Sequence, residues 1–214
     1  MDSRDQLPRL VPWAAVAALL ISGCASLVPP APPEPTPLHG PSPERVAIWP
    51  VVVGDPGVAG ERLLAGLDAA VRARGYAVPS LAVGRELLTD ANVGLGADGA
   101  PLDAAAVGKA LSADAVLVLH APRFDADERP WDGATWTMSW RLWSTRGHGL
   151  LWQYDHDGGW RRQRRDDDDP MARYDDALRT APIGGGAPVH FRDLTDLVRS
   201  LHRLACDHLP IAQR

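Results

Sequence analysis

The chain has 214 residues, of which 45% are apolar and 23% are charged, and its formal net charge is −5. This length and composition predict one folded domain of ordinary size and exclude a fibrous or wholly disordered chain. The mild negative charge argues against a nucleic-acid partner, which would favour a basic face.

The first 23 residues have the layout of a secretory signal peptide. Arg4 and Arg9 lie in a short polar start, the run from Val11 to Ile21 is almost entirely apolar, and small residues follow. As a helix, this run is too short to cross a hydrocarbon layer of about 30 Å. Residues 1–23 are therefore expected to be removed.

The signal ends in "ISGC" (Ile21–Cys24), which resembles the lipobox of bacterial lipoproteins. The resemblance implies cleavage between Gly23 and Cys24, with acylation of the cysteine. Two or three acyl chains, at about 0.8 kcal/mol per buried CH₂, would hold the protein firmly on a membrane. Ala25 and Ser26 follow instead of aspartate, which implies the outer membrane of a Gram-negative bacterium, with the domain facing the periplasm. The alternative is an uncleaved anchor or a core helix with an incidental cysteine.

Residues 24–43 are expected to be the lipidated cysteine and a proline-rich linker. Prolines favour the extended polyproline II conformation at about 3 Å per residue, which predicts a semi-rigid stalk of roughly 40–50 Å. This stalk would hold the following domain, residues 44–214, off the membrane surface. The prolines are Pro29, Pro30, Pro32, Pro33, Pro35, Pro37, Pro41 and Pro43.

Residues 44–121 alternate between strand and helix patterns, which favours a sheet with helices packed on it. The continuous β-branched first run predicts a strand buried on both faces. In chain order the expected elements are a strand at Arg45–Val53, a helix through Leu64, Leu67 and Val71, a strand at Tyr76–Ser80, a helix at Leu102–Ala113 and a strand at Asp114–Ala121.

The second half predicts a hairpin and a final helix. Residues 134–144 alternate strictly, with Trp136 and Trp140 on one face, and residues 150–158 form the returning strand. The full order is β-α-β-α-β-β-β-α, an α/β (α+β) domain with a mixed sheet of about five strands. Residues 161–188 read as a long charged loop. The apolar stripe of the last helix consists of Leu194, Leu197, Val198, Leu201, Leu204 and Ala205.

The segments "RVAIWPV", "RGYAVPSLAVGRELLTDANVG", "LSADAVLVLHA" and "WTMSWRLWSTRGHGLLW" resemble small bacterial lipoproteins of the CsgG, LpoB and PelC group, in particular the neisserial-type lipoprotein family. The resemblance covers Arg45–Asp157. It implies a non-enzymatic accessory or scaffold that assists an envelope complex in transport, export or cell-wall synthesis. A self-assembling ring-former and an envelope hydrolase or metal-dependent enzyme are the alternatives. The chain has no long paired amphipathic segments, so a pore is not expected.

Several motifs could carry chemistry, but each lacks its required context. "GLGADG" (Gly94–Gly99) matches a dinucleotide-binding pattern, yet it follows a helix-like segment and precedes Pro101, which favours a flexible loop. A calcium loop counted from Asp155 would have Gly159 at position 5. His148 and His156 lack further zinc ligands and are expected to be exposed hairpin residues. We therefore expect no cofactor, no metal and no catalytic residues.

The remaining candidates are interface residues. Trp143 has the opposite parity to Trp140 and is expected to point outward, where tryptophan is a favoured interface anchor. "RRQRRDDDDP" reads as a solvated loop or, alternatively, as a patch for an acidic partner or lipid phosphate. Cys206 is expected to be a half-buried thiol, with pairing between chains as the alternative. The candidate interface residues are Trp131, Trp143, Arg161, Arg162, Arg164 and Arg165.

Overall fold

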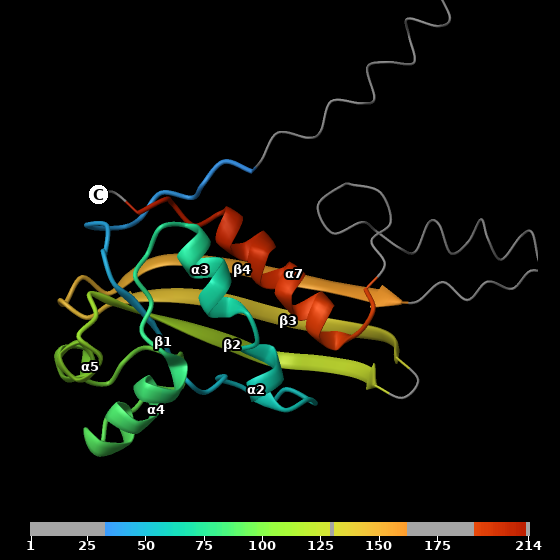
Figure 1. Ribbon diagram of the computed structural model, residues 1–214, viewed down its shortest axis with the longest axis horizontal. Helices are drawn as coiled ribbons and strands as arrows, with labels where there is room; N and C mark the ends of the chain where they lie inside the picture. Colours follow the sequence, from blue (N-terminus) through green and yellow to red (C-terminus); the bar gives the residue numbers. More distant parts are fainter. Residues whose placement is uncertain (1–32, 129–130, 162–190, 213–214) are drawn as a thin grey trace, which may run out of the picture. The chain divides into compact units, whose positions relative to one another are not determined.

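The computed structural model describes residues 33–128, 131–161 and 191–212, all within the unit Pro33–Arg214 (Figure 1). The elements are β1 (Val46–Ile48), α2 (Gly60–Leu63), α3 (Leu67–Ala73), α4 (Leu81–Asp90), α5 (Ala104–Leu111), β2 (Ala115–Glu128), β3 (Trp131–Ser144), β4 (Leu150–Arg161) and α7 (Leu194–Asp207).

The strands form one four-stranded mixed sheet in the order β1-β2-β3-β4. β1 is parallel to β2, while β2, β3 and β4 are successively antiparallel, with Trp140 opposite Leu119 on one side and Tyr154 on the other. The predicted α+β class is confirmed. The expected strand at Tyr76–Ser80 is reduced to a single bridge between Ala77 and Arg45. Pro79 follows closely and has no N–H to extend the ladder.

The first strand is shorter than the predicted Arg45–Val53 because Pro50 interrupts it. Without an N–H, Pro50 cannot continue the ladder with β2. The chain makes a detour away from β2 between Trp49 and Val53, and it is hydrogen-bonded to β2 on both sides of this detour. Trp49 N–H donates to the carbonyl of Leu117 at 2.9 Å, and Val53 N–H donates to that of Leu119 at 2.9 Å. The detour leaves the side chain of Val51 58% exposed.

Helices cover both faces of the sheet and bury two apolar clusters. α2, α3 and α7 pack on one face, where α3 and α7 lie side by side (Figure 1). The β3 residues Trp136, Met138, Trp140 and Leu142 all enter this larger cluster, which confirms the predicted alternation. α4 and α5 cover part of the other face through Leu88, Val107 and Leu111, which pack on side chains of β1 and β2.

α7 begins where the Asp193 side chain accepts a hydrogen bond from Asp196 N–H at 2.9 Å, an ordinary N-cap. Its predicted apolar stripe is buried against the sheet, apart from Leu204, which is half-buried. The buried face also includes His202 and Cys206. This helix therefore places a polar and a thiol side chain inside the larger core.

Candidate functional site

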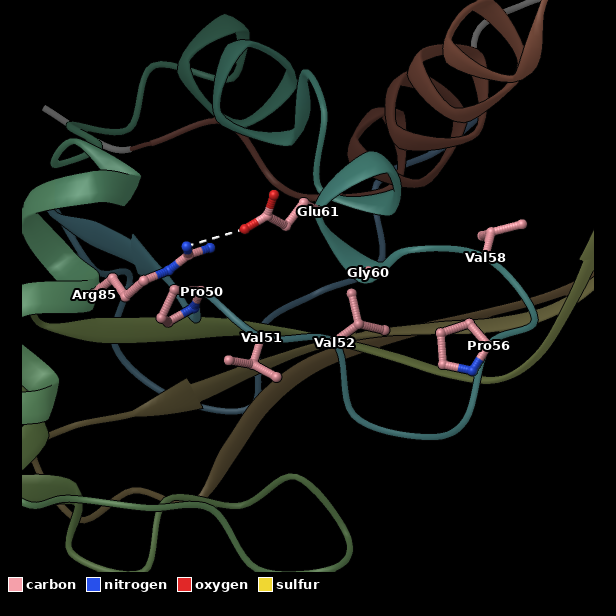
Figure 2. Close-up of a pocket in the computed structure, with 8 residues that line it drawn as sticks. All are labelled: Pro50, Val51, Val52, Pro56, Val58, Gly60, Glu61 and Arg85. Atoms are coloured by element: carbon pink, nitrogen blue, oxygen red, sulfur yellow. Dashed lines mark hydrogen bonds and ion pairs between the residues drawn. The ribbon is translucent and has the colours of Figure 1, made fainter.

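The detour after β1 opens an apolar groove of ≈ 430 Å³ (Figure 2). An ion pair between Arg85 Nη1 and Glu61 Oε1, 3.0 Å apart, lies at one side of it. This lining offers apolar contact and one exposed ion pair. The remaining lining residues are Pro50, Val51, Val52, Pro56, Val58 and Gly60.

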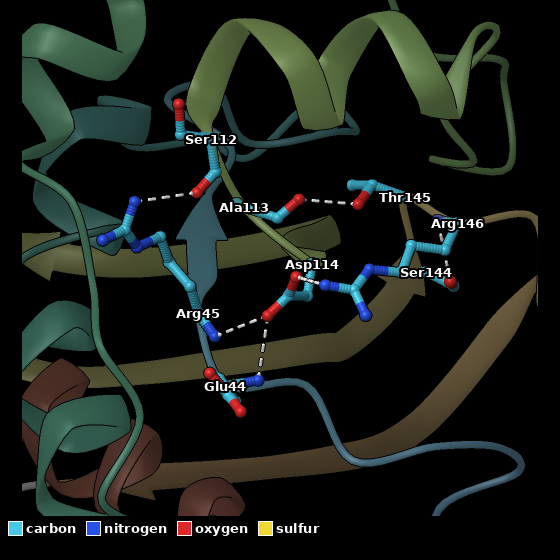
Figure 3. Close-up of polar contacts among 8 residues, drawn as sticks. All are labelled: Glu44, Arg45, Ser112, Ala113, Asp114, Ser144, Thr145 and Arg146. Atoms are coloured by element: carbon cyan, nitrogen blue, oxygen red, sulfur yellow. Dashed lines mark hydrogen bonds and ion pairs between the residues drawn. The ribbon is translucent and has the colours of Figure 1, made fainter.

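The Asp114 carboxylate links the start of the domain to the β3–β4 turn, and we call it and its partners the Asp114 clamp (Figure 3). Its Oδ2 accepts hydrogen bonds from the backbone N–H groups of Glu44 at 3.0 Å and Arg45 at 3.1 Å, and its Oδ1 pairs with the Arg146 guanidinium. Burial acts to raise the pKa of this carboxyl. The two N–H donors and Arg146 outweigh it and leave the pKa below its ordinary value.

Two further bonds tighten the same junction. Arg45 Nη1 donates to the carbonyl of Ser112 at 3.1 Å, and Thr145 Oγ1 donates to that of Ala113 at 2.6 Å. A small cavity of ≈ 290 Å³ lies beside the clamp. Because the Asp114 oxygens are already engaged, this arrangement fixes the beginning of β1 rather than activating a substrate.

The end of the proline-rich segment is bound to the domain. Thr36 N–H donates to the carbonyl of His208 at 2.8 Å, His39 N–H donates to that of Leu151 at 2.8 Å, and Leu38 packs against the larger core. Folded contacts therefore begin before residue 44, the predicted start of the domain.

His202 is fully buried and joins three elements. Its Nδ1 accepts a hydrogen bond from Trp140 Nε1 at 3.1 Å, and its Nε2 donates to the carbonyl of Leu63 at 2.7 Å. Burial lowers its pKa to about 4 although the bond to Leu63 acts to raise it, so the ring is neutral at pH 7. Sequence reasoning missed this residue. Its spacing of four residues from Val198 places it in the apolar stripe and could have shown it.

A second histidine also has a structural role. His156, predicted to be exposed, is half-buried because its ring stacks on Trp136 and its Nδ1 accepts a bond from Trp136 Nε1 at 2.9 Å. His148 is exposed in the turn, as predicted. Among the residues that the structure describes, no three His, Cys, Asp or Glu side chains come together where they could hold a metal ion.

The Gly94–Gly99 loop makes hydrogen bonds within itself and to β3. Gly96 N–H donates to the carbonyl of Ala100 at 2.8 Å, and Arg141 donates to the carbonyl of Asp98. Asp114 lies immediately before the first residue of β2. In a dinucleotide-binding fold, the acid that binds the ribose lies at the end of a strand instead. The loop therefore covers part of the sheet.

Trp143 lies on the sheet face opposite Trp140, as its parity predicts, but it does not point into solvent. It is half-buried against the smaller cluster, and its Nε1 is buried with no hydrogen-bond partner in the described part of the chain. α5 lies close enough to this face that a Cβ on Gly108 would come within 2.6 Å of Thr145 Cβ.

The other predicted interface and lipidation residues are placed only in part. Arg161 is exposed at the end of β4. The side chain of Trp131, at the start of β3, lies outside the described residues, as do Gly23, Cys24 and the rest of the arginine block (Arg162, Arg164 and Arg165). Their roles stay predictions.

Cys206 is more buried than predicted, with only 3% of its surface exposed. Burial raises the pKa of its thiol to about 12. The thiol is therefore un-ionised at neutral pH and is not placed to pair with another chain. No helix in the described ranges combines the length and apolar character needed to cross a membrane.

No protein-family profile and no curated protein matches the chain. Similar solved structures include the lipoprotein GNA1162 from Neisseria meningitidis (17% identity, TM-score 0.44, covering 64% of this chain and 93% of that one). A second is the PelC dodecamer from Paraburkholderia phytofirmans (13% identity, TM-score 0.42, covering 85% of this chain and 95% of that one). A third is E. coli LpoB (10% identity, TM-score 0.36, covering 76% of this chain and 82% of that one). At this similarity, function rests on the chain's own residues.

Proposed function

We propose that the chain is a lipid-anchored accessory protein of a bacterial cell envelope, facing the periplasm from the outer membrane. Cys24 carries the anchor, and the mixed-sheet domain binds a protein complex engaged in transport, export or cell-wall synthesis. The observation that carries this proposal is the "ISGC" motif at the end of an apolar run, followed at once by the proline-rich segment.

The contacts of residues 36–39 support the role of a tether. Since Thr36 and His39 are hydrogen-bonded to the carbonyls of His208 and Leu151, a force on the linker is transmitted to α7 and β4. Thr36 is the twelfth residue after Cys24. At about 3 Å per residue, an extended linker of this length would span roughly 35–40 Å between Cys24 and Thr36.

The chemistry of the described polar groups supports a non-enzymatic role. Three residues with shifted pKa values, His202, Asp114 and Cys206, are engaged in packing or in hydrogen bonds between elements. An enzyme would use such groups in an open cleft. The groove after β1 instead presents valine and proline side chains, which suit contact with another protein.

The proposal can be tested by photo-crosslinking of the full chain in living cells. A photoreactive amino acid is placed at Val51, 58% exposed beside the groove, or at Ile211, 65% exposed near the C-terminus. We expect one envelope protein to be captured from Val51, which lines the groove, and not from Ile211. Cys24→Ala is the control, because loss of the anchor should abolish the same product. The proposal is wrong if neither position gives a product that depends on Cys24.

A further inference from the structure

β4 (Leu150–Arg161) is the last strand of the sheet, and one of its edges faces away from β3 (Figure 1). In the described chain, one backbone hydrogen bond reaches β4 from outside the sheet and its turn, from His39 N–H to the carbonyl of Leu151. Residues 153–161 extend beyond that contact. At about 3.4 Å per residue, they offer roughly 30 Å of strand edge.

This edge lacks several of the usual features that prevent pairing. Soluble proteins blunt an edge with proline, charged side chains (above all lysine), a bulge or a very short strand. Residues 153–161 contain neither proline nor lysine, and their register with β3 is unbroken from Trp152 to Arg161. The irregularity in this ladder lies at the other end, between Leu142 and Trp143.

We propose that this edge pairs antiparallel with β4 of a second copy of the chain, about a two-fold axis through Gly158. Charge and the length of the paired segment favour this register. Asp155, Asp157 and Arg161 share one sheet face because residues two apart along a strand point the same way. With the axis at Gly158, Asp155 lies opposite the partner's Arg161, and the same pair recurs on the other side of the axis.

Neighbouring registers are less favourable. An axis at Asp157 places this carboxylate opposite the same residue of the partner. An axis at His156 places Asp155 opposite the partner's Asp157, twice. Like charges directly opposite destabilise a strand pair. An axis at Gly159 also pairs unlike charges, since Asp157 then lies opposite the partner's Arg161, but it shortens the paired segment from residues 155–161 to residues 157–161. The Gly158 register therefore gives the longest paired segment that joins unlike charges.

The opposite face adds an aromatic contact. Tyr154, His156 and Trp160 are half-buried along β4, and the rings of Tyr154 and His156 are 6.2 Å apart. His156 is held by its bond from Trp136. In the proposed register, His156 lies opposite the partner's Trp160, and aromatic pairs across strands stabilise a sheet. The pairing would cover side chains that a single copy leaves partly exposed.

An interface of this kind closes on itself, because the same surface is used by both copies. It gives a dimer and not a ring. The inference is independent of the proposed accessory function, since an anchored accessory protein can work as a monomer or as a dimer.

The test is sedimentation velocity of the full chain in detergent over a range of concentrations, with the detergent mass subtracted. We expect the parent to form a dimer. Arg161→Asp or Asp155→Arg alone should raise the dissociation constant about tenfold or more, since each brings like charges together twice. The double variant D155R/R161D restores unlike pairs and should return the constant to within about threefold of the parent.

Asp157→Asn separates the registers. It should leave the dissociation constant unchanged with the axis at Gly158, where residue 157 lies opposite the partner's Gly159. It should tighten pairing with the axis at Asp157 and weaken pairing with the axis at Gly159. Hydrogen exchange provides a measurement without substitutions, since amides in residues 155–161 of the parent should exchange more slowly as the concentration rises. A monomer at every concentration, a double variant no better than the singles, tightening or weakening by D157N, or concentration-independent exchange would each overturn the proposal.

Discussion

Protonation of His202 should set much of the acid sensitivity of the fold. Its pKa falls from the ordinary 6.5 to about 4, because the ring is fully buried. The folded state therefore binds this proton less tightly than the unfolded chain does. The contribution of the neutral ring to the free energy of unfolding is fully present above pH 6.5, and it is lost as the pH drops toward 4. Each pH unit corresponds to about 1.4 kcal/mol, so the free energy of unfolding should fall by about 3 kcal/mol over this window.

The perturbation is His202→Leu in a form of the chain that starts at Ala25. The variant loses the titrating ring, so its free energy of unfolding should depend less on pH between 6.5 and 4. At pH 7 it should be less stable than the parent, because Trp140 Nε1–H and the Leu63 carbonyl lose their partner in the core. Each unsatisfied group costs about 1–3 kcal/mol.

Urea unfolding at pH 7, 6 and 5 measures both effects. Burial also lowers the pKa of His156 and of His120, and these groups are present in parent and variant alike, so the difference between the two profiles isolates His202. His148→Gln, in the exposed turn, is the control and should leave the profile unchanged. Parallel profiles for parent and His202→Leu would refute this reasoning, as would a His202 ring that titrates near pH 6.5 by NMR.

The remaining predictions concern four other positions that are strained, hydrogen-bonded or buried. Gly54→Ala should lower the free energy of unfolding by roughly 2 kcal/mol or more, because φ is +116° and a Cβ would lie 2.5 Å from the Ala121 carbonyl oxygen. Gly147→Ala, also at positive φ but with no atom within 4 Å, should cost about 1 kcal/mol in the same urea titration. Asp114→Asn should cost about 1.5–3 kcal/mol at pH 7. Its deficit should shrink as the pH falls below 3.8, because a lowered carboxyl pKa stabilises the fold above that value and loses its effect in acid. Cys206 should react with a thiol reagent at pH 8 at least about a hundredfold more slowly than free cysteine until the chain unfolds, and equal rates would contradict its burial.

The parts of the fold that depend on local pattern could be predicted from the sequence. The alternation of Trp136, Met138, Trp140 and Leu142 places them in one core, because successive strand residues face opposite sides. The same rule assigns Trp143 to the other face. It cannot say that the smaller cluster covers that face there, because the packing partners come from distant segments.

The parts that depend on distant partners could not be predicted. The break at Pro50 is visible in the sequence, but the return of the chain to β2 at Val53 requires the carbonyl of Leu119. Asp114 reads as the start of a strand, and its donors at Glu44 and Arg45 lie about seventy residues earlier. His202 acquires its role only when Trp140 and Leu63 are placed around it.

The mass of the amino-terminal peptide isolated from membranes tests the central claim of a lipid anchor most directly. We expect a first residue at Cys24, the absence of residues 1–23, and added mass from a diacylglyceryl group on the thiol and an acyl chain on the amine. A peptide that begins at Met1, or an unmodified Cys24 in membrane-bound protein, would contradict it.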